Sequence, residues 1–335
     1  MKISVIVPVY NAMPWLEECL DSLFCQELSA QEYEVICIND GSTDGSGDLL
    51  CTYRERHPNL LVISQPNSGV VAARNAGIAR ASGEYIWFVD ADDRVAHNAL
   101  SRLCDGLDDR MELLQFGGYQ FENTLTVEEE TRACRGNLPC NAPGTGSVVW
   151  RNLIRRDFLI RNALSFRHPQ LTHGEDGQFL YELLSLQPQT QTLPDILYFY
   201  RVREGSAETA SSAQSQLRRY RSHVEVVRIM KGYYDSGRRD ELTANRLMLT
   251  LWLALYDIAA FPLSQAVAQW KALKREGLCL CSGIPECTVK CSYMFDMHSP
   301  LGRGMDAIYR KQHHPLGLCV TWLARHLLAL ARKLG

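Results

Sequence analysis

The fold of this protein is decided first by the stretch Ile3-Ser4-Val5-Ile6-Val7-Pro8-Val9, which is almost entirely apolar. A strand with one face in water alternates apolar and polar residues, whereas a strand covered on both faces is a continuous apolar run. Strands of the second kind are typical of parallel sheets that carry helices on each side. This stretch therefore predicts a central strand of an α/β fold.

Helix and strand patterns alternate in the residues that follow. Asn11 and Pro14 are expected to open a helix, as its cap and a first-turn residue, and Asp44 to cap the next one. Further strands are predicted at Tyr33–Ile38, Leu60–Ser64 and Glu84–Val89, and a further helix at Val70–Ala81. Strands separated by helices pair in parallel through right-handed crossovers. The sequence thus predicts a doubly wound domain, in which ligands bind at the carboxyl ends of the strands.

The remainder of the chain is less regular and then becomes helical. From about Leu103 to Arg203 the pattern is mixed, with a loop rich in Gly, Pro and Asn at Gly136–Ser147 and a strand-like segment at Ile196–Arg201. From Ser211 onward helical patterns predominate. We therefore expect three parts, at residues 1–103, 104–206 and 207–335.

The composition is that of an ordinary globular protein. The chain has 335 residues, of which 46% are hydrophobic and 22% charged, and a net charge of −3. This length suffices for one large or two moderate cores, and the charge argues against a nucleic-acid-binding protein. Lys2 is followed at once by the first strand, which leaves no room for a signal peptide, so a cytoplasmic protein is expected. The apolar stretch Leu247–Leu263 is shorter than the ~20 residues of a membrane span and predicts a buried helix.

The 12 cysteines are scattered along the chain, and we expect them to be reduced and mostly buried. Four of them lie near one another, at Cys279, Cys281, Cys287 and Cys291. Their spacing lacks the paired C-x2-C knuckles of typical zinc sites. Structural zinc is therefore the less favoured interpretation.

An acidic segment, Asp90-Ala91-Asp92-Asp93, directly follows the predicted strand Glu84–Val89. Three carboxylates within four residues repel one another unless a cation lies among them. Oxygen ligands of this kind suit Mg²⁺ or Mn²⁺, ions that usually accompany phosphate. The alternative is a polar loop whose last residue, Asp93, caps the following helix.

Two common nucleotide-binding loops are missing. A dinucleotide-binding fold would place G-x-G-x-x-G after the first strand, but the segment Val9–Pro14 contains no glycine. The chain also lacks the G-x4-G-K-[ST] loop of many ATPases and kinases. An NAD-dependent enzyme or a P-loop protein is therefore disfavoured.

Ordered blocks over residues 1–206 resemble the inverting family 2 glycosyltransferases. The blocks are Ile3–Asn11, Asn39–Asp44, Asn67–Gly77, Phe88–Asp93, Trp150–Leu159, His173–Phe179 and Leu197–Arg203. The resemblance implies a GT-A type fold, which is a doubly wound mixed α/β sheet, here with a C-terminal helical extension. Residues 1–103 would form the nucleotide-sugar-binding half, 104–206 the acceptor-binding half and 207–335 a helical subdomain.

The resemblance also assigns residues to the donor. Asp40 would accept the imide N–H of uracil; an Asx turn with Gly41 is the other interpretation, and both can hold at once. Tyr10 would cover the base, unless it is a core tyrosine, and the backbone near Pro8 would contact it. Arg74 would reach the base or pyrophosphate; otherwise it is an arginine on a helix surface.

The metal site and the diphosphate follow from the same resemblance. Asp90 would face ribose hydroxyls and the metal, and Asp92 would be the direct ligand of Mn²⁺ or Mg²⁺. Arg201 and Arg203 are candidates to clamp phosphate, although surface ion pairs explain them almost as well.

An acceptor hydroxyl is a weak acid, so a sugar-transfer reaction needs a general base. The resemblance points to Asp176, with Glu175 beside it, as that base. The alternative is a helix start that carries acids in its first turn because the helix dipole favours them there.

The C-terminal segment 316–335 predicts a basic amphipathic helix. Val320, Leu323, Leu327, Leu330 and Leu334 share one face of it, and no Asp or Glu follows Asp306. Such a helix can lie on an anionic membrane surface, or it can pack on the protein or on a partner.

Together these features predict an enzyme, an inverting glycosyltransferase of the hexosyltransferase type in bacterial polysaccharide biosynthesis. It would move a sugar from a nucleotide sugar, expected to be a UDP-sugar, to a hydroxyl of a surface glycan or lipid-linked acceptor. The expected location is the cytoplasm, with peripheral contact on the inner face of the cell membrane through residues 316–335. The alternatives are a metal-dependent nucleotidyltransferase and a non-catalytic nucleotide-sugar-binding subunit.

Overall fold

The computed structural model describes residues 1–122, 125–126, 128–130, 148–203, 212–258, 261–276 and 278. The chain divides into two compact units, Met1–Pro169 with Glu175–Glu204 and Gln170–Gly174 with Gly205–Gly335. The loop predicted at Gly136–Ser147, the four clustered cysteines and the C-terminal helix lie outside the described residues.

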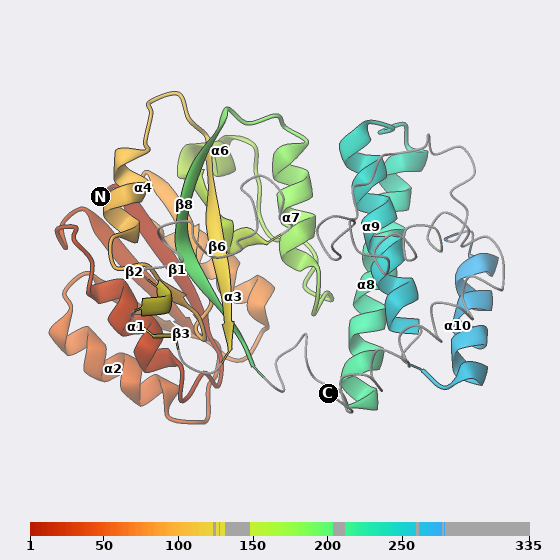
Figure 1. Ribbon diagram of the computed structural model, residues 1–335, viewed down its shortest axis with the longest axis horizontal. Coiled ribbons are helices and arrows are strands. Elements are labelled where there is room, and N and C mark those ends of the chain that lie inside the picture. The colour runs from red at the N-terminus through yellow and green to blue at the C-terminus, as the bar shows by residue number, and fades with distance from the viewer. Residues whose placement is uncertain are drawn as a thin grey trace. The chain divides into compact units, whose positions relative to one another are not determined.

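The first unit contains one sheet and the helices around it (Figure 1). The strands are β1 Ile3–Val9, β2 Tyr33–Asn39, β3 Leu60–Ser64, β4 Tyr85–Phe88, β5 Arg94–Val95, β6 Leu113–Glu122, β7 Asn152–Arg155 and β8 Thr190–Val202. The helices are α1 Leu16–Phe24, α2 Ser46–Arg56, α3 Val70–Arg80, α4 Ala99–Asp105, α6 Arg156–Arg161 and α7 Glu175–Leu184, with a short 3-10 turn at Val149–Arg151.

The sheet has eight strands in the order β3-β2-β1-β4-β7-β6-β8-β5. The pairings β1–β2, β1–β4 and β2–β3 are parallel, as the alternating pattern predicted. The strand β7 then runs antiparallel to both β4 and β6, and β6 pairs in parallel with β8. The predicted mixed α/β sheet is therefore confirmed.

Both faces of the central strand are buried, which explains its continuous apolar sequence. Val5 and Val7 face a core that includes Leu20 of α1 and Leu50 of α2. Ile6 points to the opposite core, which includes residues of α3, α6 and α7 such as Phe179. Alternate side chains of one strand therefore enter two different cores, because successive residues of a strand point to opposite faces.

The first helix begins later than predicted. It starts at Leu16, and the prediction that Asn11 caps it is wrong. Asn11 has a positive φ of 48° and its side-chain oxygen accepts the backbone N–H of Thr43 at 2.8 Å. The side chain is thus occupied by the loop after β2 and is unavailable to the helix.

The loops after β1 and β2 are bound to each other. The carboxylate of Asp44 accepts the backbone N–H of Met13 at 2.9 Å, as well as that of Ser46 in the first turn of α2 at 3.1 Å. The hydroxyl of Ser46 in turn accepts the N–H of Ala12 at 3.0 Å. Two neighbouring loops at the carboxyl edge of the sheet are thereby fixed together.

The described part of the second unit is helical, with α8 at Ala213–Asp235, α9 at Glu241–Ile258 and α10 at Leu263–Arg275. The stretch Leu247–Leu263, predicted as a buried helix, belongs to α9 as far as Ile258, and its last residue, Leu263, begins α10 after the non-helical Pro262. Its acid Asp257 is buried and paired with Arg219 and His223. No helix among the described residues has the length and apolarity to cross a membrane.

Of the described cysteines, Cys19 and Cys37 are buried and Cys25 and Cys51 are exposed, all as free thiols. The prediction of reduced thiols agrees with this. The prediction that most cysteines are buried holds for Cys19 and Cys37 but not for the other described cysteines.

Gly77 allows α3 to pack closely on β1. A methyl group at this position would lie 2.3 Å from Cγ2 of the buried Ile6, a distance at which atoms overlap. We expect Gly77→Ala to lower the free energy of unfolding by about 1–3 kcal/mol through overpacking. Gly232 in α8 has no atom within 4 Å of the same position, so Gly232→Ala should raise stability by about 0.5–1 kcal/mol. Urea unfolding of both variants measures these effects, and a change in the free energy of unfolding of the same sign in both would contradict the packing argument.

Candidate active site

Polar residues gather where β1, β2 and β4 end. Tyr10 follows β1 and is 53% exposed, so the alternative of a core tyrosine is wrong. Pro8 lies inside β1 opposite Ile38, within the parallel ladder. Asp40 follows β2, and Asp90 comes two residues after the end of β4. These residues share one edge because the three strands are parallel.

Asp40 is buried and its carboxylate holds the loop before α3. Its Oδ1 accepts the side-chain N–H of Gln65 at 2.7 Å and the backbone N–H of Ser68 at 2.9 Å, and its Oδ2 accepts the N–H of Gly69 at 2.8 Å. The predicted alternative of an Asx turn is wrong for Asp40, since Asn39 supplies the oxygen that the nearby Ser42 N–H bonds. A carboxylate oxygen accepts two hydrogen bonds, so Oδ2 keeps capacity for one further donor.

Arg74 is a buried bridge between two acids. Its guanidinium contacts Oδ1 of Asp90 at 3.1 Å and Oε1 of Glu175 at 3.0 Å, and it lies 5.3 Å from the ring centre of Phe166. With 4% of its surface exposed, it is not the surface arginine of the alternative interpretation. Burial acts to lower the pKa of Arg74, but the charges of Asp90 and Glu175 outweigh it and raise that pKa.

The acidic segment carries one fully buried carboxylate. Asp93 accepts the hydroxyl of Tyr198 at 2.6 Å and the backbone N–H of Arg201 at 2.7 Å. The alternative in which Asp93 caps the next helix is wrong, because α4 begins only at Ala99. Burial, together with the charges of its two neighbouring acids, raises the pKa of Asp93 well above its ordinary value. Burial also raises the pKa of Asp90, against the effect of Arg74 and with a contribution from Asp92.

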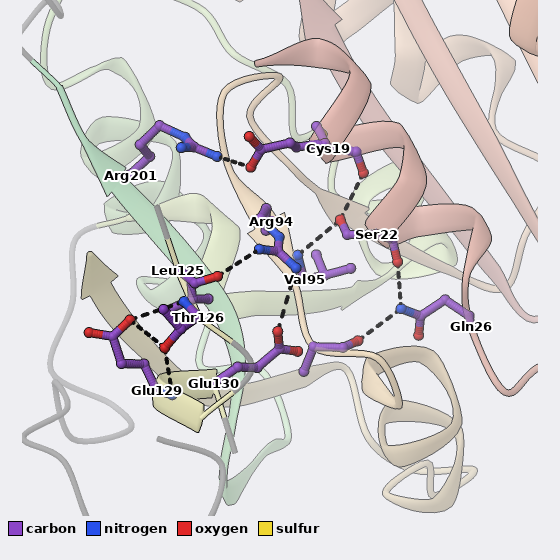
Figure 2. A network of polar contacts seen from close by, with 12 residues as sticks. Cys19, Ser22, Gln26, Arg94, Val95, Leu125, Thr126, Glu129, Glu130 and Arg201 are labelled. Carbon is purple, nitrogen blue, oxygen red and sulfur yellow. Dashed lines mark hydrogen bonds and ion pairs between the residues drawn. The ribbon is translucent and has the colours of Figure 1, made fainter. Parts of the chain in front are cut away.

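Two arginines of the β8 end contact Asp92. The Nε of Arg203 lies 2.7 Å from Oδ2 of Asp92, and its guanidinium stacks 4.3 Å from the ring centre of Trp15. Arg201 donates from Nε to the backbone oxygen of Asp92 at 2.8 Å and reaches Glu18 of α1 at 2.6 Å. Figure 2 shows this arginine extending from β8 toward α1. Arg201 is only 4% exposed, so a surface ion pair does not describe it.

Asp176 lies in the first turn of α7, directly after Glu175. Its Oδ1 accepts the backbone N–H of Gly177 at 2.7 Å. Its negative charge raises the pKa of both Arg74 and Asp90, which follows from their proximity. The predicted helix start and the predicted cluster of acids therefore both exist here.

The acids fit a metal that binds through few protein ligands. Among the residues that the structure describes, no group of three or more His, Cys, Asp or Glu side chains is arranged to hold an ion. Mg²⁺ often takes only one or two carboxylates and completes its shell with water and substrate phosphate. Asp90 and Asp92 supply oxygen ligands of that kind, and the crowding of negative charge around them favours a cation.

Comparison with known proteins identifies the family. The sequence profile of "Glycosyl transferase family 2" matches residues 4–158. YibD of Escherichia coli, named "Uncharacterized glycosyltransferase", is 30% identical over 245 residues, which cover 69% of this chain and 70% of that protein. The chain belongs to glycosyl transferase family 2. EpsJ of Bacillus subtilis, also named "Uncharacterized glycosyltransferase", is 34% identical over 216 residues, covering 59% of this chain but only 60% of EpsJ.

Solved structures agree with the family 2 assignment at the level of the fold. TarS 1–349 of S. aureus, in complex with UDP-GlcNAc, superposes with a TM-score of 0.53 at 20% identity and covers 83% of this chain and 92% of that one. The mannosyltransferase PcManGT of Pyrobaculum calidifontis, in complex with GDP-Man and Mn²⁺, gives a TM-score of 0.53 at 18% identity, covering 97% and 87%. Both likenesses support the predicted GT-A fold.

The structure thus brings together most of the predicted site residues of this family 2 chain. Arg74 joins Asp90 to Glu175 and so links the donor residues to the predicted base motif. The roles of Pro8, Tyr10 and Asp40 in binding a base stay predictions. Sequence reasoning missed Tyr198 and Glu18, whose contacts to the acidic segment and to Arg201 join positions more than 100 residues apart.

Replacing Arg74 with Met should be strongly destabilising. The change leaves two acids without their buried cation, and breaking a buried pair in this way costs about 3–5 kcal/mol. Glu175→Gln keeps an oxygen that accepts from Arg74, so its cost should be clearly smaller. Urea unfolding at neutral pH measures both, and a loss under about 1 kcal/mol for Arg74→Met would contradict the bridging role.

Proposed function

We propose that this protein is an inverting glycosyltransferase that moves a sugar from a nucleoside diphosphate sugar to a hydroxyl group. The observation that carries the proposal is the cluster of Asp90, Glu175 and Asp176 around Arg74, with Asp92 close to Asp90. Membership of family 2 and the glycosyltransferase names of the relatives support it. The acceptor would be a surface glycan or a lipid-linked saccharide.

The donor is proposed to be a UDP-sugar. The remaining lone pair of Asp40 Oδ2 suits the imide N–H of uracil, and the exposed ring of Tyr10 has an apolar face for the base. The complex of TarS with UDP-GlcNAc supports a uridine donor in this fold. The pyrophosphate would lie toward Asp90 and Asp92.

Mn²⁺ or Mg²⁺ is proposed as the cofactor, with Asp92 as its direct ligand and Asp90 beside it. The structure of PcManGT, which has the same fold, is a complex with GDP-Man and Mn²⁺, and this supports the choice of ion. A bound divalent ion would neutralise charge on the diphosphate as the sugar–phosphate bond breaks. Arg203 pairs with Asp92, and its guanidinium would also contact the same phosphates.

Asp176 is proposed as the general base. It would accept the proton of the acceptor hydroxyl while that oxygen attacks the anomeric carbon from the face opposite the diphosphate. A single displacement of this kind inverts the anomeric centre and needs no covalent sugar–enzyme intermediate. Glu175 would serve the site by holding Arg74 rather than by taking the proton.

A nucleotidyltransferase is the other enzymatic candidate. It would be expected to carry a glycine-rich basic loop after β1, and residues 10–14 contain neither glycine nor a basic residue. A non-catalytic nucleotide-sugar-binding subunit would bind donor without turning it over, which the next experiment detects.

Two variants separate binding from chemistry. Asp92→Ala should lose Mn²⁺-dependent binding of UDP by at least about tenfold, because it removes a metal ligand. Asp176→Asn should keep donor binding, yet lose at least about 100-fold in transfer, because the general base is gone. Calorimetry with UDP and Mn²⁺, and a turnover assay on a panel of nucleotide sugars, measure the two effects.

The matched control is Asp105→Asn, which changes an exposed acid on α4 and should alter neither quantity. Retained transfer in Asp176→Asn would refute the base. Donor binding without any turnover in the unmodified protein, over all donors and acceptors, would favour the non-catalytic subunit.

Peripheral membrane contact through residues 316–335 is proposed on sequence grounds alone. The full chain should sediment together with vesicles that contain anionic lipid, whereas a chain that ends at residue 315 should stay in the supernatant. Equal sedimentation of the two chains would contradict it.

A further inference from the structure

The end of β8 holds the acidic segment Asp90–Asp93 in place. The Tyr198 hydroxyl donates to Oδ2 of Asp93 at 2.6 Å and accepts the backbone N–H of Asp90 at 3.0 Å. Arg201 adds two bonds, from its backbone N–H to Oδ1 of Asp93 at 2.7 Å and from its Nε to the backbone oxygen of Asp92 at 2.8 Å. Four hydrogen bonds from one strand therefore fix a segment of four residues.

Tyr198 is itself held firmly. Its ring is fully buried and stacks on Trp150 with 4.3 Å between ring centroids and 13° between the planes. Trp87 contacts the same tyrosine edge-on at 6.3 Å and donates its indole N–H to the backbone oxygen of Trp150 at 2.8 Å. Gly118 makes room for this stack, because a methyl group there would lie 2.4 Å from Trp150. The position of the Tyr198 hydroxyl is thus set by packing on its ring.

The chain on the far side of the acidic segment is fixed as well. Ser22 of α1 accepts the backbone N–H of Val95 at 3.2 Å, and Gln26, which follows that helix, donates to the backbone oxygen of Ala96 at 2.8 Å (Figure 2). The segment therefore lies between two anchored strands, β4 and β5, and the hydrogen bonds from β8 fix it at Asp90, Asp92 and Asp93.

We infer that Tyr198 and Asp93 are positioning residues for the divalent-cation site, an inference that rests on the proposed function. The carboxylate of Asp93 binds Tyr198 and Arg201 of β8, so it would not be a ligand of the ion and instead holds the backbone of the segment in place. The Tyr198 hydroxyl fixes both ends of the segment at once, at the N–H of Asp90 and the side chain of Asp93. Asp90 and Asp92 thereby keep their carboxylates at one edge of the sheet, where Asp92 would bind the metal directly with Asp90 beside it.

The test removes a single oxygen atom. In Tyr198→Phe the buried ring stays, but Asp93 loses a donor and the Asp90 N–H loses its acceptor. Residues that orient metal ligands typically change metal affinity by about 10–100-fold, so we expect the Mn²⁺ concentration for half-saturation of UDP binding to rise at least about tenfold. Calorimetry over a Mn²⁺ series measures this without turnover. Hydrogen exchange should also show faster exchange of the Asp90 amide.

The matched control is Tyr53→Phe, which removes the hydroxyl that a second buried tyrosine donates to an acid, Asp21, away from the site. Tyr198→Phe should lose more stability in urea than Tyr53→Phe, because Asp93 is buried and Asp21 is exposed, but under conditions where both variants are folded only Tyr198→Phe should shift the Mn²⁺ dependence. A shift under twofold, or an equal shift in Tyr53→Phe, would overturn the inference. Asp93→Asn carries the same test should Tyr198→Phe not fold.

The outcomes also separate this inference from the function on which it rests. If the unmodified protein binds UDP with Mn²⁺ and Tyr198→Phe does so equally well, only the positioning role is wrong. If the unmodified protein shows no Mn²⁺-dependent binding, the proposed function is wrong and the inference falls with it.

Discussion

Repulsion among the three carboxylates of Asp90–Asp93 is the constraint on which the carboxyl edge of the sheet depends. Each of the three carboxylates is stabilised against this repulsion by a different partner. Arg74 of α3 pairs with Asp90, Arg203 after β8 pairs with Asp92, and the neutral Tyr198 hydroxyl binds Asp93. The raised pKa of Asp90 and of Asp93 indicates that these partners offset only part of the repulsion and burial cost. A divalent cation is the natural complement of such an edge.

Arg74 extends this electrostatic arrangement to the second half of the first unit. Its contact with Glu175 reaches across about one hundred positions of sequence. A buried guanidinium without a paired acid would cost much free energy. The pair with Glu175 therefore helps to hold Arg74 beside Asp90, and the pair with Asp90 helps to hold it beside Glu175. The residue that family resemblance assigned to the donor therefore also ties the donor edge to the base motif, and the geometry of one half depends on the other.

The sequence predicted those features that local patterns encode. The strands β1 to β4 and the helix α3 were located nearly to the residue, because burial on both faces leaves a continuous apolar run and helices leave periodic stripes. The two-residue strand β5 and the antiparallel strands β6 and β7 were not located, since short or mixed segments carry no such pattern. The error at Asn11 arose because a loop from the next crossover occupies its side chain.

The site was predictable in composition but not in arrangement. Family motifs pointed to Asp90, Asp92 and Asp176 as acids of interest. No motif could indicate that Arg74 is buried between two of these regions, or that Arg201 contacts α1, because both facts depend on tertiary packing. Tyr198 lies within the family block Leu197–Arg203. A tyrosine in a strand is usually a core residue, so the sequence did not indicate its hydrogen bond to Asp93.

The central claim is that a divalent cation held at Asp90 and Asp92 binds the diphosphate of a sugar donor. The most direct measurement is anomalous diffraction at the manganese edge from crystals soaked in Mn²⁺ and UDP. The account predicts a single strong peak in contact with an Asp92 oxygen and with oxygens of both phosphates. A well-bound UDP with no peak beside Asp92, or manganese bound away from this edge of the sheet, would contradict it.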